Sequence, residues 1–179
     1  MMNSQALYNF NAACILVICG ILGGAFYFQF GLHEQPCPLC LLQRMAMLGL
    51  ISALVFNMYF GIRNEHIALV IVSAMVGVTF SIRQVLLHIC PVPGEPTGYG
   101  TAVLGMHLYS WGVLVFGAST LGAACFLVLA QNEAPDTRRL PSQFEKFAFY
   151  AGSFMCLANL VAACFECGLG PCCENGPCP

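Results

Sequence analysis

Five long apolar stretches constrain this sequence more than any other feature. They cover about residues 11–30, 41–60, 66–87, 108–130 and 147–165. Each approaches the roughly 20 residues that a helix needs to cross a hydrocarbon core of about 30 Å. Lipid offers no water to backbone N–H and C=O groups, so such continuous stretches satisfy them as helices. The sequence predicts an all-α integral membrane protein: a four-helix transmembrane bundle plus a fifth C-terminal transmembrane helix.

The composition supports a membrane protein and argues against a nucleic-acid-binding protein. Of the 179 residues, 59% are hydrophobic and 8% are charged, whereas about a quarter of a soluble domain is charged. The formal net charge is only −2 and no basic run is present, which argues against nucleic-acid binding. We therefore expect membrane lipid around the chain and no nucleic-acid partner.

Positive charges set the expected orientation. Arg63 follows the second span, and Arg138, Arg139 and Lys146 follow the fourth. The outer connections carry no Lys or Arg, so the positive-inside rule places the N-terminus in the cytoplasm and the C-terminal tail outside. In a bacterium this means a multi-pass inner-membrane protein with a periplasmic tail. The expected parts are a core of residues 1–130, a cytoplasmic polar connection of residues 131–146, and a fifth helix with a Cys-rich tail, residues 147–179.

The second span begins with two cysteines, Cys37 and Cys40, which are separated by two residues. Pro38 suits the first position of a helix, because its missing N–H has no partner there. A cysteine at a helix N-terminus is more readily ionised, since the positive end of the helix dipole favours the thiolate. Arg44 lies four residues after Cys40 and therefore shares its helix face. This arrangement favours redox chemistry at the pair.

Two other interpretations of Cys37 and Cys40 stay open. A static disulfide would close a loop too short to stabilise the fold much. A metal site would need two further ligands, such as His33 or tail cysteines. We expect no metal and rank redox chemistry first.

The segment CPLCLLQR, residues 37–44, lies between two spans and resembles the quinone-linked membrane thiol oxidases of the disulfide bond formation protein B family. The resemblance covers roughly residues 10–130. It implies a four-helix bundle that holds ubiquinone or menaquinone near its outer face. Cys37 and Cys40 would pass electrons to the quinone, with Cys40 attacking its ring.

The resemblance also suggests cofactor-binding residues. Arg44 would lie beside the quinone, although an arginine near a span end often only reaches for headgroups. Arg83 lies near the outer interface, as an anchor or as part of the quinone pocket. His88, at the end of the same span, is a candidate for relaying protons or an ordinary interfacial residue.

The second outer loop departs from the family pattern, which places a second cysteine pair there. This loop holds only Cys90. We therefore expect Cys167 and Cys172, in the tail, to be the pair that exchanges with a soluble partner. Cys90 pairing with a tail cysteine is the alternative. A separate bridge between Cys173 and Cys178 is a further candidate.

Together these features predict an inner-membrane protein disulfide oxidoreductase. It would reoxidise a soluble periplasmic thioredoxin-like dithiol oxidase and pass the electrons to membrane quinone, which supports disulfide bond formation. One alternative is a vitamin K epoxide reductase-like quinone enzyme, in which the CxxC comes late in the chain. Another is a metal-binding membrane protein that uses the Cys-rich tail.

Overall fold

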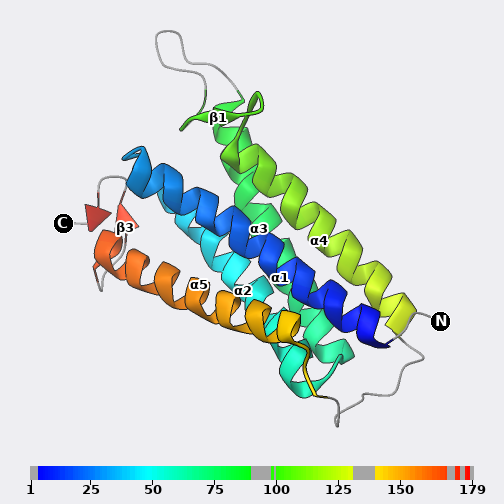
Figure 1. Ribbon diagram of the computed structural model, residues 1–179. Helices are drawn as coiled ribbons and strands as arrows, with labels where there is room; N and C mark the ends of the chain where they lie inside the picture. Colours follow the sequence, from blue (N-terminus) through cyan, green and yellow to red (C-terminus); the bar gives the residue numbers. More distant parts are fainter. Residues whose placement is uncertain are drawn as a thin grey trace.

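Five long helices form the protein in the computed structural model, which describes residues 4–89, 98, 100–130, 140–168, 172–173 and 176–177 (Figure 1). Within these ranges, all five are long and apolar enough to cross a membrane. The predicted all-α membrane fold is therefore confirmed. The helices are α1 (Ser4–Phe26), α2 (Pro38–Phe60), α3 (Asn64–His88), α4 (Leu108–Ala130) and α5 (Gln143–Cys167).

Helix ends differ from the expected spans where local bonding extends a helix beyond its apolar part. The fifth helix begins at Gln143 instead of residue 147, because Ser142 and Glu145 form a capping box at its start. Hydropathy marks only the segment that lies in lipid, whereas backbone hydrogen bonds continue to the capping residue. Of the predicted polar connection 131–146, residues 131–139 lie outside the described ranges. The division of the chain at residues 130 and 147 stays a prediction.

A π-helical turn, η1 (Tyr27–Gly31), extends α1 at its C-terminal end. Such turns insert an extra residue into the helical repeat and occur mostly at functional sites. The turn carries Gln29, whose side chain is buried. It therefore aims a polar group into the bundle at a place where the sequence shows only an apolar span.

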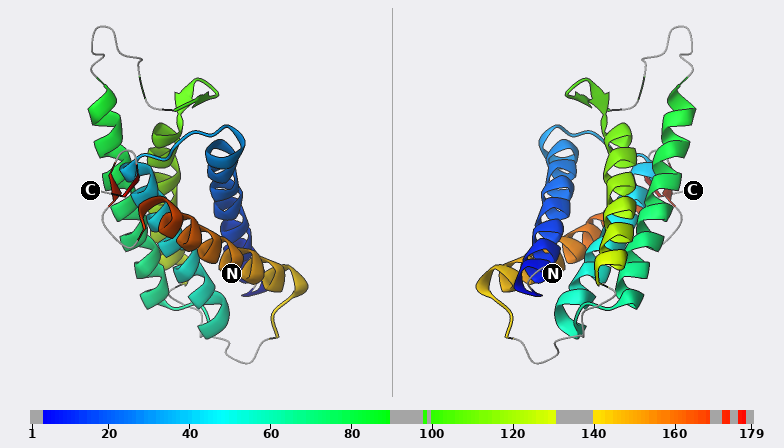
Figure 2. Two further views of the ribbon diagram at one scale, coloured as in Figure 1. Left: turned by 90° about the vertical axis from the view of Figure 1, so that its left-hand side faces the viewer. Right: turned by 90° about the vertical axis from the view of Figure 1, so that its right-hand side faces the viewer.

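Two small hairpins lie outside the five long helices. β1 (Ala102–Val103) pairs antiparallel with β2 (Met106–His107), and β3 (Cys172–Cys173) pairs antiparallel with β4 (Gly176–Pro177). Leu104 and Gly105 join the first pair with positive φ angles of 52° and 80°, as tight hairpin turns require. The β1–β2 hairpin lies beyond the ends of α1 and α4, at the level of the end of α3 (Figure 2). Cys90 and Cys178 lie outside the described residues.

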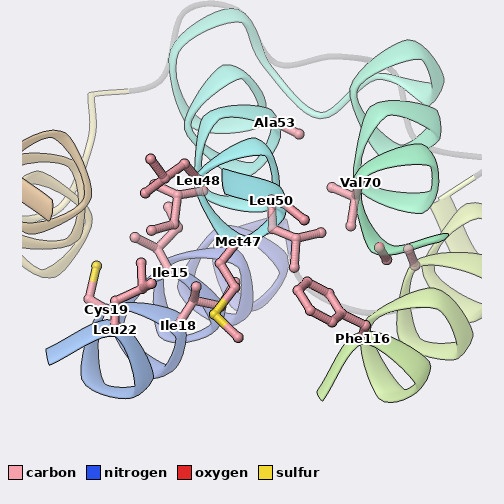
Figure 3. Close-up of a cluster of buried hydrophobic side chains, with 14 of the residues drawn as sticks. Ile15, Ile18, Cys19, Leu22, Met47, Leu48, Leu50, Ala53, Val70 and Phe116 are labelled. Carbon is pink, nitrogen blue, oxygen red and sulfur yellow. The ribbon is translucent and has the colours of Figure 1, made fainter. Parts of the chain in front are cut away.

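Helix α2 lies at the centre of the bundle. It packs on α1, α3 and α5, while α3 also packs on α4 and α5 also packs on α1. Buried side chains of α1, α2, α3 and α4 form one core cluster, including Ile15, Leu22, Leu50, Val70 and Phe116 (Figure 3). Helices α1 and α5 run in the same direction, so the start of α1 and the end of α5 lie at opposite ends of the bundle (Figure 1).

Helices α3 and α4 approach closely at Gly77. A Cβ atom at this position would overlap the ring of Phe116, which is completely buried. Small residues allow this kind of contact between membrane helices, where packing rather than water exclusion drives association. The glycine therefore fixes how α4 lies against α3, and with it the position of the N-terminal end of α4.

Candidate active site

Cys37 and Cys40 form a disulfide at the start of α2, with their Cα atoms 5.1 Å apart. Cys37 is the N-cap residue, and its Sγ accepts a hydrogen bond of 3.1 Å from the backbone N–H of Cys40. Pro38 occupies the first turn, as expected. Cys37 is buried, at 9% exposure. The pair thus lies at the positive end of the α2 dipole, where a thiolate is stabilised after reduction.

Gln84 of α3 contacts both sulfur atoms. Its Nε2 lies 3.2 Å from Cys37 Sγ and 3.4 Å from Cys40 Sγ. Its Oε1 accepts a 2.7 Å hydrogen bond from Gln43 Nε2. Gln84 is only 1% exposed, and donors to sulfur stabilise a thiolate more than a neutral sulfur. Gln84 was not among the residues predicted for the site, although a polar residue in an apolar span signals function.

A cavity of about 540 Å³ adjoins the disulfide. Cys40 lines it, together with Gln43, Gln84 and Arg44, while most of the remaining wall is apolar or aromatic. Cys37 is not among its lining residues. The cavity thus presents one sulfur of the pair, two amides and one guanidinium to a mostly apolar space, which is the usual make-up of a small-molecule site.

Arg44 is anchored beside this cavity by α1 and η1. Its Nη2 donates to the carbonyl of Ala25 at 3.0 Å, and its Nη1 donates to Oε1 of Gln29. Its guanidinium also lies 5.5 Å from the centre of the Phe26 ring, within the range of a cation–π contact. Gln29 in turn donates from Nε2 to Glu166 of α5 at 2.8 Å. The guanidinium is therefore held in one place.

His88 lies behind the cavity wall. Its ring stacks on Tyr109 with centroids 5.3 Å apart, and His107 stacks on the same ring at 5.3 Å. Tyr109 itself is buried and lines the cavity. Arg83, by contrast, is exposed and is not among the lining residues. Of the three predicted cofactor-binding residues, only Arg44 therefore faces the cavity directly.

Two loops contribute to the wall of the cavity at this end of the bundle. The Glu34 carboxylate accepts from the backbone N–H of Thr101 at 3.3 Å and from the hydroxyl of the same residue. Trp111 Nε1 donates to the carbonyl of Val103 at 3.0 Å. Glu34, Val103 and Trp111 all line the cavity. The Glu34 bonds tie the loop before the disulfide to the loop that carries the β1–β2 hairpin, and the Trp111 bond ties that hairpin to α4.

The tail begins at the same end of the molecule. Cys167, the last residue of α5, takes part in a disulfide, and β3, which contains Cys172, contacts the end of α5. Among the described residues, the five free cysteines all lie within helices: Cys14, Cys19, Cys125, Cys156 and Cys164. In the same part of the chain, no group of three or more His, Cys, Asp or Glu side chains is placed to hold a metal ion.

Comparisons with known proteins point to one family. A family profile described as "Disulfide bond formation protein DsbB" matches residues 8–130. "Disulfide bond formation protein B 1" of Pseudomonas savastanoi pv. phaseolicola is 30% identical over 162 residues, covering 70% of this chain and 96% of that relative. "Disulfide bond formation protein B" of Haemophilus influenzae (strain 86-028NP) is 40% identical over 73 residues, covering 38% of this chain.

The coverage of the relatives is uneven. The match spans only 41% of the Haemophilus protein, and 46% of "Disulfide bond formation protein B" of Pseudomonas syringae pv. tomato, which is 41% identical over 78 residues. The chain thus spans less than half the length of these two relatives. No solved structure matches the chain.

Proposed function

Because this chain belongs to the disulfide bond formation protein DsbB family, we propose that it is a quinone-dependent protein disulfide oxidoreductase of the bacterial inner membrane. It takes two electrons and two protons from a periplasmic thioredoxin-like dithiol, which becomes a disulfide, and delivers them to membrane quinone, which becomes quinol. The family match favours this function over the vitamin K epoxide reductase-like alternative. The charge distribution supports a cytoplasmic N-terminus and a periplasmic tail.

One observation carries the proposal: the Cys37–Cys40 disulfide presents Cys40 to a mostly apolar cavity of about 540 Å³ beside Arg44. The chemistry of the wall fits a quinone. A flat, apolar ring matches the aromatic side chains, and its oxygens match amide and guanidinium donors. When bound, a quinone supplies an acceptor for two electrons and two protons.

A neighbouring cavity fits an isoprenoid tail. This second, largely apolar cavity of about 420 Å³ lies between α1 and α4, and Ile21 and Val115 line both cavities. The two cavities are therefore adjacent at these side chains. A long apolar chain in the second cavity would be held by the burial of its apolar surface alone. Ubiquinone and menaquinone share such a tail, and we propose either as the cofactor.

Different residues of the chain carry out the successive steps of electron transfer. A thiolate of the partner attacks the outer disulfide, proposed as Cys167–Cys172, and thiol–disulfide exchange then reduces Cys37–Cys40. In the reduced pair, Cys40 keeps its thiolate near the α2 N-terminus and the Gln84 amide, and faces the cavity. Arg44 provides fixed positive charge where negative charge develops on the acceptor oxygen.

Two further residues support the site from outside. We propose that His88 backs Tyr109 and moves protons between the cavity wall and the outer face. Arg83 is exposed near the end of α3. We propose that its guanidinium binds lipid headgroups at the membrane surface and that it affects the quinone site only indirectly.

A mixing experiment tests the function. Purified protein in detergent is given a reduced thioredoxin-like protein and a short-chain ubiquinone, and quinone absorbance is followed. The wild type should reduce the quinone, and Cys40→Ser should not. Cys125→Ser is the matched control, because Cys125 is a free cysteine in α4 and should retain full activity. If neither ubiquinone nor menaquinone is reduced by the wild type, the proposal is wrong.

A further inference from the structure

Glu166 of α5 is linked to the active-site arginine through one side chain. Gln29 donates from Nε2 to Glu166 Oε1 at 2.8 Å and accepts at Oε1 from Arg44 Nη1. A carboxylate only accepts hydrogen bonds and a guanidinium only donates them. The two charged groups therefore fix the amide of Gln29 in one orientation. A change in either group alters the hydrogen bonding of the other through this amide.

This link joins the positive charge of Arg44 to the negative charge of Glu166. Arg44 is half-buried and Gln29 is 6% exposed, so the guanidinium is poorly hydrated. The other three carboxylates in the described ranges are engaged elsewhere: Glu34 with Thr101, Glu65 with Arg63, and Glu145 in the capping box of α5. Within the described residues, Glu166 is thus the carboxylate that acts on Arg44.

Glu166 also comes from a part of the chain that the core does not contain. The family match ends at residue 130, whereas Glu166 lies at the end of α5, beside Cys167. The fifth helix packs on α1, which is followed directly by the η1 turn with Gln29, and on α2, which carries Arg44. The helix therefore brings a charge to the active site, in addition to carrying the tail.

We propose that Glu166 is a positioning residue for the quinone site: through Gln29 it orients the guanidinium of Arg44 toward the cavity and balances its charge. This inference rests on the proposed function. Without Glu166, the amide of Gln29 is free to turn its N–H groups toward Arg44, two donors would then face each other, and the guanidinium would leave its place. Quinone affinity would fall while the disulfide stays intact.

Binding of quinone can be measured without turnover, because Trp111 is the single tryptophan of the chain and lines the cavity. A short-chain ubiquinone is titrated into oxidised protein in detergent, and quenching of Trp111 fluorescence gives the Kd. Glu166→Gln keeps the size of the side chain and removes its charge. We expect the Kd to rise about tenfold, the effect of losing roughly one charge-assisted hydrogen bond.

A charge swap separates positioning from general stability. In the double variant Gln29→Glu, Glu166→Gln the carboxylate moves next to Arg44 and the amide moves to α5, so donors and acceptors match again. We expect its Kd to return to within about threefold of the wild-type value. A residual difference of this size is expected because the energy of one interaction changes slightly when its surroundings change. Glu65→Gln is the matched control, since Glu65 forms an exposed ion pair with Arg63 and lies in the first turn of α3; its Kd should not change.

The outcomes distinguish the two proposals. Quenching in the wild type with an unchanged Kd in Glu166→Gln overturns the positioning role and leaves the proposed function standing. A raised Kd that the double variant does not restore also overturns it, because Glu166 would then only stabilise the fold. No saturable quenching in the wild type refutes quinone binding itself, and the positioning role with it.

Discussion

The hydrogen bonds of Gln84 to both active-site sulfurs predict a shift in the redox potential of the pair. In Gln84→Leu the side chain keeps a similar volume but loses its donors to Cys37 and Cys40, now at 3.2 and 3.4 Å. A hydrogen bond is worth about 1 kcal/mol to a neutral acceptor and about 2 kcal/mol to a charged one. The amide therefore stabilises a thiolate over the disulfide by about 1 kcal/mol.

This difference sets the size of the shift. For a two-electron couple, about 1.4 kcal/mol corresponds to roughly 30 mV, so the potential of Gln84→Leu should be lower by about 20 mV. The reduced form is the one destabilised, so the variant is harder to reduce. The shift should grow as the pH rises, because more of the reduced pair is then thiolate, and shrink toward low pH.

The assay is equilibration in glutathione buffers of graded ratio, followed by alkylation and mass analysis of the peptide that holds both cysteines. Ser81→Ala is the matched control: Ser81 lies one turn before Gln84 on α3, is equally buried, and its hydroxyl has no hydrogen-bond partner in the described residues. Its potential should equal that of the wild type. An unchanged or higher potential in Gln84→Leu would refute the argument that the amide favours the thiolate.

Three other outcomes are expected. Replacing Cys167 and Cys172 by serine should abolish quinone reduction driven by the protein partner and preserve reduction driven by a small dithiol; equal rates with the partner, measured by quinone absorbance, would contradict the shuttle assignment. Arg44→Gln should raise the quinone Kd about tenfold, whereas the exposed Arg83 should tolerate Gln with less than a twofold change, read from tryptophan quenching. Gly77→Ala places a methyl group against a buried ring and should lower the free energy of unfolding by about 1–3 kcal/mol, measured by titration with denaturing detergent; unchanged stability would show that α3 and α4 separate easily there.

The fold class could be read from the sequence because its signal is local. Each span is long and apolar enough that only a helix satisfies its backbone in lipid, and all five appear in the structure. The place of Cys37 as N-cap and of Pro38 in the first turn follows from the chemistry of a few neighbouring residues. For the same reason Arg44 had to lie one turn inside α2.

The partners of these residues were decided only by tertiary structure. Gln84, Gln29 and Glu166 make their contacts across helix interfaces, through hydrogen bonds between residues 15 to 137 positions apart in sequence. A helix that is apolar on every side carries little information about which face turns inward, so the rotation of each helix follows from close packing such as that at Gly77. The sequence alone therefore determined the spans and the thiol pair, whereas packing decided which polar side chains meet them.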